Sequence, residues 1–156
     1  MSKIYNSIGT MSGTSFDGID VSLISTNGQD VFDVKNNLYE KFDEQIKSNL
    51  KKIKESIKNY KDINEIKSSK LFVEVENKIT DLHIKLIKTL ILKFEEKVNL
   101  VGFHGITLFH DPKNKFSFQI GNIKKICESI KLPIVYNFRQ NDLNHGGQGA
   151  PLTPIF

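Results

Sequence analysis

The chain has 156 residues, 38% of them hydrophobic and 26% charged, which is enough for one globular domain with a substantial core. No apolar run is long enough to span a bilayer, no leader-type apolar stretch follows Met1, and Cys127 is the only cysteine, so we expect a cytoplasmic chain without disulfides. The net charge of +4 comes from lysines spread along helical stretches, with Arg139 as the only arginine, and this distribution argues against a nucleic-acid-binding surface.

The beginning of the chain has a strand pattern. Short apolar runs of strand type occupy residues 3–11, 19–25 and 31–38, and Asn27-Gly28 between the last two is a strong hairpin-turn signal. We therefore predict a three-stranded antiparallel meander. The first turn of this meander, residues 9–20, is rich in Gly, Ser and Thr.

The middle of the chain has a helix pattern. Apolar residues recur at spacings of three and four from Phe42 to Tyr60 and again from Val75 to Phe94, which predicts two amphipathic helices with charged outer faces. Asp62 is a candidate cap for a helix that begins between these two runs. His83 lies beside the apolar stripe of the longer helix, and we assign it no chemical role.

The last third alternates strands and helices. The predicted elements are a buried strand over 99–105, a hairpin around Asp111-Pro112, a helix over 123–130 and a strand over 132–138. Asn122 is expected to cap the helix, with Cys127 on its apolar side. A three-stranded antiparallel meander followed by helix–strand–helix–strand is the ribonuclease-H-like α/β layout of many phosphotransferases.

Residues 132–151 combine one carboxylate with several glycines. Asp142 is followed by Gly146, Gly147 and Gly149, and an apolar run precedes it. This order predicts a buried strand that delivers a carboxylate to a sheet edge, followed by a loop that lets a ligand approach the backbone. A carboxylate there can act as a general base or bind a metal. The alternative is an ordinary glycine-rich turn, and this stretch alone leaves both open.

The first turn is a candidate anion site. A Gly-, Ser- and Thr-rich turn between two strands offers backbone N–H groups and hydroxyls to nucleotide phosphates without a lysine, and Asp17 and Asp20 are candidates to orient Mg²⁺. The alternative is a plain hairpin turn, but the turn is longer than the two residues that a hairpin needs. No P-loop, no dinucleotide-binding motif and no zinc-ligand spacing occurs in the sequence.

Four motifs spread along the chain resemble those of the anhydro-N-acetylmuramic acid kinase family. They are Met11-Ser-Gly-Thr-Ser-Phe-Asp-Gly-Ile-Asp20, Phe103-His-Gly105, Phe118-Gln-Ile-Gly-Asn122, and the stretch from Phe138 that closes in Gly147-Gln-Gly-Ala-Pro-Leu152. The resemblance implies a lobe of the actin/hexokinase/sugar-kinase fold and a role in peptidoglycan recycling. It implies ATP-dependent phosphorylation of 1,6-anhydro-N-acetylmuramic acid with hydrolytic opening of the anhydro ring, giving N-acetylmuramic acid 6-phosphate.

The resemblance also assigns roles to residues, with ATP and Mg²⁺ as cofactors and an amino sugar as substrate. Asp142 is the expected general base. Cofactor binding is implied for the first turn: Gly13, Thr14, Ser15, Phe16, Asp17, Gly18, Ile19 and Asp20. Substrate binding is implied for His104, Arg139, Gly147, Gln148 and Gly149. For His104 a structural hydrogen bond at the strand end is the alternative, and for Arg139 a structural salt bridge.

Two positions and the length depart from the family pattern. Ile106 stands where the family has Gln, and Asn137 stands where it has Asp, so each removes a polar or charged group near the expected sugar site. Family members are longer and have two lobes, so we expect residues 1–156 to be a single N-terminal lobe, and the full-length protein is a candidate homodimer. The alternatives are a non-catalytic lobe that needs a partner chain, and a nuclease, which would require an acidic residue in the strand over 3–11.

Overall fold

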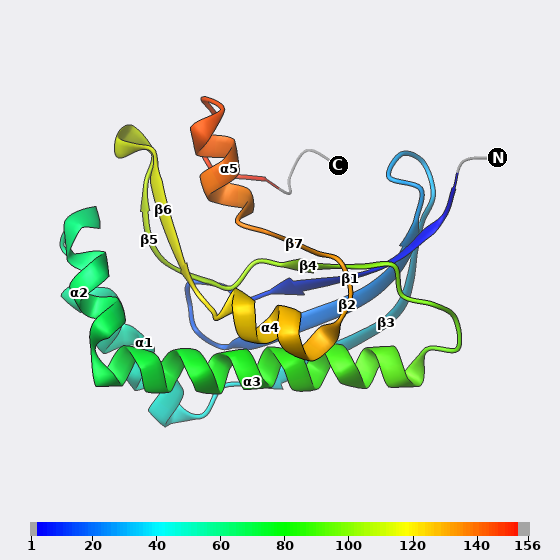
Figure 1. Cartoon of the computed structure of the whole chain (residues 1–156), viewed down its shortest axis with the longest axis horizontal. Helices are drawn as coiled ribbons and strands as arrows, with labels where there is room; N and C mark the ends of the chain where they lie inside the picture. Colours follow the sequence, from blue (N-terminus) through cyan, green and yellow to red (C-terminus); the bar gives the residue numbers. More distant parts are fainter. Residues whose placement is uncertain (1–2, 153–156) are drawn as a thin grey trace.

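The computed structural model describes residues 3–152, and residues 1–2 and 153–156, which include both chain ends, lie outside the described part. Its centre is a five-stranded sheet with strand order β3-β2-β1-β4-β7 (Figure 1). The first three strands are β1 (Tyr5–Met11), β2 (Gly18–Thr26) and β3 (Phe32–Lys41), paired antiparallel in chain order. The predicted meander is therefore confirmed. The Asn27-Gly28 signal lies in a five-residue connection, in which Asn27 Oδ1 accepts three backbone N–H groups.

Two further strands extend the sheet in parallel. They are β4 (Leu100–Phe103), which pairs with β1, and β7 (Ile134–Tyr136), which pairs with β4. The intervening helices are α1 (Glu44–Ser56), α2 (Ile63–Ser68), α3 (Lys70–Lys93) and α4 (Ile123–Ile130), with the short 3₁₀ turn η1 (Tyr60–Asp62) before α2. Because β1, β4 and β7 are parallel, their carboxyl ends meet at one edge of the sheet, where ligands of α/β proteins usually bind.

A hairpin separates β4 from α4. Its strands are β5 (Ile106–Asp111) and β6 (Phe116–Ile120), joined by the 3₁₀ turn η2 (Pro112–Asn114), as the sequence predicts. The hairpin rises from the sheet beside α5 (Phe138–Asn144), the last helix (Figure 1). A bridge between Ser12 and Ile106 joins the base of the hairpin to the β1–β2 turn.

Helices α1, α3 and α4 lie on one side of the sheet (Figure 1). Alternate side chains of β2 point into this core, so Ile19, Val21 and Leu23 are fully buried against apolar positions of α1 and α3. The opposite face of the sheet carries Met11 and Tyr39, whose side chains remain 47% and 54% exposed. One face of the sheet is thus a packed core and the other is open.

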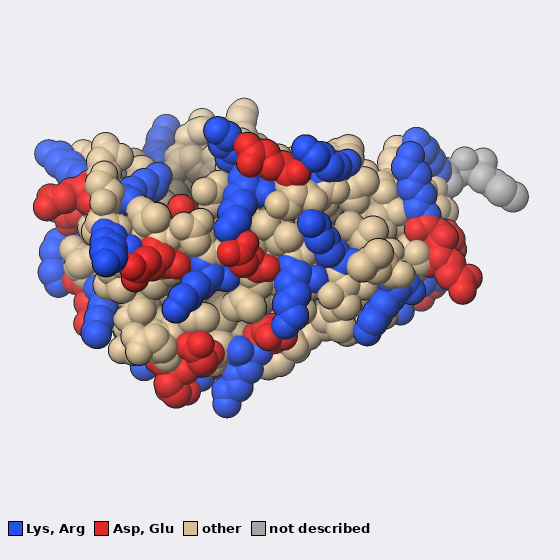
Figure 2. Space-filling view, turned by 60° about the horizontal axis from the view of Figure 1, so that its bottom comes forward, with Lys and Arg blue, Asp and Glu red and all other residues tan. Residues whose placement is uncertain are grey.

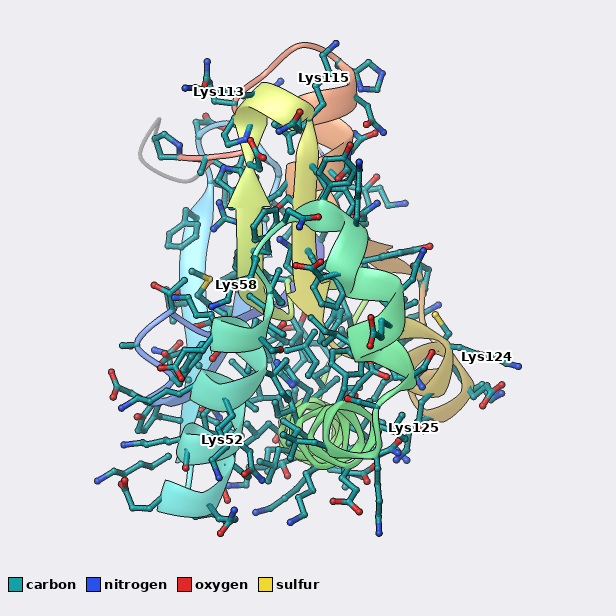
Figure 3. The ribbon with its side chains drawn as sticks, turned by 90° about the vertical axis from the view of Figure 1, so that its left-hand side faces the viewer. Lys52, Lys58, Lys113, Lys115, Lys124 and Lys125 are labelled. Atoms are coloured by element: carbon teal, nitrogen blue, oxygen red, sulfur yellow. The ribbon has the colours of Figure 1, made fainter. Side chains whose placement is uncertain are left out.

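Charged side chains of both signs are intermixed on the surface in Figure 2, with no large area of one sign. The lysines labelled in Figure 3 point outward from α1 and the connection that follows it, from the hairpin tip and from α4. Of these, Lys125 pairs with Asp81 at 2.7 Å. This arrangement is typical of solvated helix faces.

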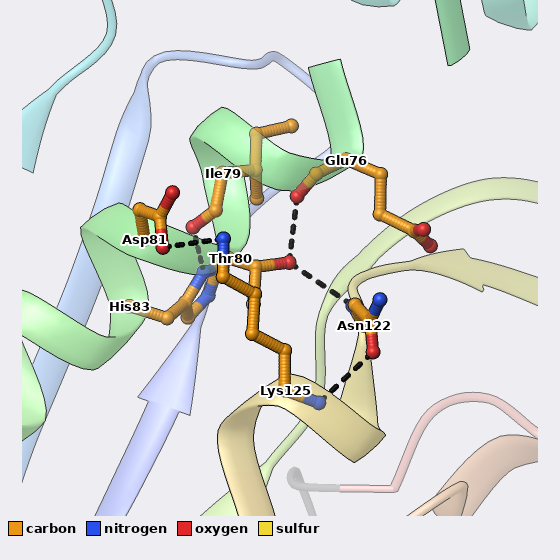
Figure 4. A network of polar contacts seen from close by, with 7 residues as sticks. All are labelled: Glu76, Ile79, Thr80, Asp81, His83, Asn122 and Lys125. Carbon is orange, nitrogen blue, oxygen red and sulfur yellow. Dashed lines mark hydrogen bonds and ion pairs between the residues drawn. The ribbon is translucent and has the colours of Figure 1, made fainter. Parts of the chain in front are cut away.

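Helix α3 is joined to α4 by a polar network (Figure 4). The Thr80 hydroxyl donates to the Glu76 carbonyl at 2.6 Å and accepts the Asn122 N–H at 3.0 Å. Asn122 Oδ1 accepts the Lys125 N–H at 3.0 Å, so the predicted cap of α4 is confirmed. Asp62 does precede α2, but its carboxylate accepts the N–H groups of the preceding residues 58 and 59 and does not cap that helix.

The burial of Cys127 and His83 can be compared with the predictions from the sequence. Cys127 is exposed, so its placement on the apolar side of α4 is wrong; the buried residues are Ile126 and Ile130, one turn apart. His83 is fully buried, donates from Nδ1 to the Ile79 carbonyl at 2.8 Å and packs edge-on against Phe103. Burial lowers the pKa of His83 to about 4, so its ring is a neutral packing group.

Candidate functional site

A pocket of about 480 Å³ lies on the open side of the sheet, against the parallel strands. Its walls come from β1, β2 and β4 together with Asp20, His104, Arg139 and Leu152. A second hollow beside it is lined by Asp142, Asn141 and His145 and shares Phe138 and Leu152 with the first. The fold therefore brings Asp20 and His104, from distant parts of the sequence, together with Arg139 and Asp142 of α5 around adjoining hollows.

The β1–β2 turn is fixed at both ends. The Ser12 hydroxyl donates to the Gly18 carbonyl at 2.6 Å, and the Phe16 N–H donates to the Gly13 carbonyl at 3.2 Å. The Phe16 side chain is only 2% exposed and belongs to the core, although its backbone has a left-handed φ of 60°. Thr14 and Ser15, between these anchors, are exposed. The turn thus presents their hydroxyls and backbone to solvent, while Phe16 and Ile19 can meet a ligand only through their backbone.

Gly13 and Gly18 have different surroundings. A Cβ at Gly18 would collide with the Glu40 carbonyl oxygen and the Tyr39 ring, so the pairing of β2 with β3 requires this glycine. A Cβ at Gly13 would meet nothing closer than the Ser15 hydroxyl at 3.4 Å, an ordinary contact. Nothing in the described fold requires glycine at 13. A ligand that approaches the backbone closely would explain it.

Asp17 and Asp20 point in different directions. The Asp17 carboxylate lies 3.9 Å from the Lys47 ammonium of α1, on the helix-covered side, whereas Asp20 lines the pocket on the open face. Within residues 3–152, no three His, Cys, Asp or Glu side chains come close enough to hold a metal together. Asp20 is therefore the better placed of the two for a hydrated ion, since Mg²⁺ keeps several waters and needs few protein ligands.

Asp142 lies on a helix. The predicted strand is present as β7, but it is largely exposed and ends at Tyr136, and residues 138–144 form α5, so the expectation of a buried strand that leads directly to the carboxylate and its loop is wrong. Gly146, with a φ of 91°, follows the last turn of α5 and is a glycine of the kind that commonly ends a helix, so it is the local sequence signal for α5. The helix ends in hydrogen bonds that fold the following residues back toward Asp142.

The glycines after α5 hold the Asp142 carboxylate. The Gly149 N–H donates to Asp142 Oδ2 at 2.8 Å, and the Gly147 N–H donates to the Asp142 carbonyl at 2.9 Å. A Cβ at Gly147 would collide with the carboxylate itself. Gly149 is buried with a φ of 68°, and a Cβ there would come within 2.9 Å of the His110 ring. Both glycines are thus explained by support of Asp142, while Gln148 between them is exposed.

Arg139 and His104 bind each other. Arg139 Nε donates to His104 Nε2 at 3.0 Å, and Arg139 Nη1 donates to the Gly149 carbonyl at 2.9 Å. Among residues 3–152 no carboxylate pairs with the guanidinium, so the predicted alternative of a salt bridge is wrong. Burial lowers the pKa of His104, the hydrogen bond to the Gly105 carbonyl opposes this, and the Arg139 charge lowers it further. The predicted structural hydrogen bond of His104 at the strand end is thus present.

The two departures from the family pattern have structural explanations. Ile106 is fully buried at the base of the hairpin, where its side chain joins the core. Asn137 precedes α5 with a left-handed φ of 62°, a conformation that Asn adopts more readily than most residues. Asn137 also lines a third hollow of about 470 Å³ between the hairpin and α5, which includes Gln119 and Tyr136.

The sheet order, the parallel strands with their connecting helices and the anchored first turn define a class of protein. The described residues form an α/β lobe of the ribonuclease-H-like, sugar-kinase type. No helix within residues 3–152 is long and apolar enough to cross a membrane.

Comparison with known proteins gives the family. The family model described as anhydro-N-acetylmuramic acid kinase matches residues 5–156, and the chain belongs to this family. A protein of that name from Pelagibacter ubique is 43% identical over 156 residues, which are all of this chain and 41% of the relative. Proteins of the same name from Rhizobium etli and Rhodopseudomonas palustris are each 35% identical, over 100% and 96% of this chain and 42% and 41% of their own lengths. The chain thus corresponds to the N-terminal part of these relatives, about two fifths of their length.

Proposed function

We propose that this chain is the N-terminal lobe of a kinase that transfers the γ-phosphoryl group of ATP to 1,6-anhydro-N-acetylmuramic acid, with water opening the anhydro ring. The supporting observation is the Asp142 carboxylate, which is held by a backbone N–H through Oδ2 and lines a hollow that adjoins the pocket on the open side of the sheet. A carboxylate oriented in this way is suited to accept a proton. Membership in the family supplies the substrates.

In the proposed reaction, a water molecule attacks the anomeric carbon and gives a proton to Asp142 Oδ1, the oxygen that Gly149 leaves free. The bond between the anomeric carbon and the bridging oxygen breaks. The bridging oxygen forms a bond to the γ-phosphorus of ATP, and ADP leaves. The product is N-acetylmuramic acid 6-phosphate, in which the water oxygen is on the anomeric carbon and the former bridging oxygen carries the phosphoryl group.

The nucleotide would lie against the first turn. Gly13 leaves room above the backbone, and the exposed Thr14 and Ser15 offer hydroxyls and N–H groups to phosphate oxygens. Asp20 would hold a water of the Mg²⁺ hydration shell, and the ion would neutralise charge on the phosphates. We place the reaction in the cytoplasm, where ATP is available, and propose a homodimer for the full-length protein.

A hybrid enzyme tests this proposal. Residues 1–156 would replace the matching part of the Pelagibacter ubique relative, and ADP release would be measured with ATP and 1,6-anhydro-N-acetylmuramic acid. We expect sugar-dependent turnover and a phosphorylated product by ³¹P NMR. The unmodified relative is the control. A folded hybrid that lacks this turnover, beside an active relative, would contradict the proposal.

We also propose that residues 1–156 alone do not turn over the sugar. The pocket is walled only from one side by this lobe, and the open sheet face leaves Met11 and Tyr39 exposed. Closure around reacting groups is worth on the order of 7–11 kcal/mol of barrier. Calorimetric titration with MgATP should show binding no tighter than about 1 mM. Micromolar binding or steady sugar-dependent ADP release would show that this lobe suffices.

A further inference from the structure

An unbroken series of hydrogen bonds joins the end of β4 to the Asp142 carboxylate. Arg139 Nε donates to His104 Nε2 at 3.0 Å, Arg139 Nη1 donates to the Gly149 carbonyl at 2.9 Å, and the Gly149 N–H donates to Asp142 Oδ2 at 2.8 Å. Gly149 is therefore held through both of its backbone polar groups. Its carbonyl is bound by a guanidinium and its N–H orients a carboxylate.

The direction of these hydrogen bonds determines which ring nitrogen of His104 carries the proton. A guanidinium can only donate, so His104 Nε2 must be the unprotonated, accepting nitrogen. The ring proton is then on Nδ1, which donates to the Gly105 carbonyl at 2.9 Å. Both ring nitrogens are thus used within the protein, and a neutral His104 anchors Arg139 from β4.

Little else holds the segment that carries Gly149. Within the described residues 148–152, Gly149 alone is hydrogen-bonded to the rest of the chain, through the two bonds above. The earlier bonds of this loop end at Gly147. If the Arg139 bond were lost, the Gly149 N–H would be positioned mainly by packing against Leu143 and His110, which is a weaker constraint.

We propose that His104 and Arg139 are positioning residues that fix Gly149, and through it orient Asp142. This positioning role is enough to explain both residues, and a contact with the sugar is not needed to explain them. Arg139 Nη2 makes no hydrogen bond within residues 3–152, so it is the one guanidinium nitrogen that could still contact a sugar. The catalytic meaning of this arrangement rests on the proposed role of Asp142 as a base. The arrangement itself can be tested in this chain without any turnover.

The test is the Gly149 amide in ¹⁵N-labelled residues 1–156. We would measure its hydrogen exchange and its ¹H shift in His104→Leu and Arg139→Met, with thermal melts to confirm folding. Exchange should accelerate roughly five- to tenfold in both variants, and the amide resonance should move upfield, because the hydrogen bond to Asp142 opens. His104→Gln should restore the parent values, since a Gln side-chain oxygen can accept from Arg139 Nε in the place of Nε2.

His145→Ala is the matched control. The His145 side chain is near the same loop but hydrogen-bonds only to the Asn141 carbonyl of α5, so its loss should leave the Gly149 amide unchanged. If Gly149 keeps its exchange rate and shift in folded His104→Leu and Arg139→Met, the proposal is wrong. If either fails to fold, Arg139→Lys decides the question: one ammonium cannot make both bonds in the same geometry, so the same acceleration is expected and its absence contradicts the proposal.

Kinetics in the hybrid enzyme separates positioning from sugar binding. Arg139→Met should lower kcat about tenfold or more with a smaller change in the KM for the sugar, whereas loss of a direct sugar contact would mainly raise that KM. A rise in KM alone would overturn the positioning role. An inactive parent hybrid with an intact Gly149 response would contradict the proposed function while leaving the hydrogen-bond series standing.

Discussion

The two glycine-rich loops of this lobe have similar compositions, but the structural reasons for their glycines differ. In the β1–β2 turn, a side chain at Gly13 would meet only an ordinary contact, so the protein leaves empty space there. In the loop after α5, a side chain at Gly147 would collide with Asp142, and Gly149 combines a positive φ with close packing. A glycine indicates a ligand only where its neighbours do not already require it.

The polar groups of the two loops differ in the same way. Thr14 and Ser15 in the first turn are exposed and hydrogen-bond to no described residue, which leaves them free for phosphates. In the second loop, the N–H groups of Gly147 and Gly149 are already bound to Asp142. The first loop is therefore suited to bind an anion and the second to position a carboxylate. Substitutions that act on only one of the loops test this distinction.

The largest expected effect is that of Asp142→Asn in the hybrid enzyme. The change keeps the shape of the side chain and removes the proposed general base, so kcat should fall at least about a hundredfold. Stability should change little because Gly149 can still donate to the amide oxygen. Steady-state kinetics and a thermal melt measure the two effects. Near-normal turnover would remove the role assigned to Asp142.

Gly147→Ala should have the next largest effect. The added methyl group occupies the place of the Asp142 carboxylate, so either the carboxylate or the loop must shift. Overpacking of this kind costs about 1–3 kcal/mol of unfolding free energy, and kcat should fall about tenfold or more. Denaturant unfolding and turnover of the hybrid check both. Gly13→Ala is the control, with an expected stability change within about 0.5 kcal/mol.

Gly13→Val addresses the first loop alone. A branched side chain there leaves the fold intact but fills the space above the turn, so the KM for ATP should rise severalfold while the KM for the sugar stays nearly constant. Kinetics of the hybrid with each substrate varied in turn distinguishes the two constants. Equal increases in both would mean that the turn has a structural role and that the space at Gly13 is incidental.

Much of the fold, but only part of the site, was predictable from the sequence. The meander, the hairpin and the long helix follow from apolar periodicity, which records burial of one face. The strand predicted over 132–138 is present as β7, but helix α5, which carries Asp142, is not predicted, although Gly146 is a local signal for the end of a helix. The bond between His104 and Arg139 joins residues 35 positions apart, and no local pattern encodes such a contact.

The smallest expected effect is a pH dependence confined to the second loop. Burial lowers the pKa of His104 below its ordinary value, against the opposing hydrogen bond to Gly105, and the Arg139 charge adds to the lowering. The unfolded histidine binds its proton near pH 6.5, so the stabilisation by neutral His104 is complete above about that pH and is lost as pH falls through the lower, folded pKa. Protonation would place a donor against Arg139 Nε and break the bond that supports Gly149.

Hydrogen exchange measures this effect, with each rate corrected for its intrinsic pH dependence. Protection of the Gly149 amide should decrease as pH falls below the ordinary histidine pKa, and it should decrease more than that of Phe16, which is bonded to Gly13 in the first turn. His104→Gln removes the titrating group and keeps an acceptor, so its Gly149 amide should lose the pH dependence. His83 is also buried and neutral, with a pKa of about 4, so its stabilisation of the core is lost as pH falls from 6.5 toward that value, and this loss is shared by both loops. If protection of Gly149 declines no more than that of Phe16, the pH dependence assigned to the second loop is wrong.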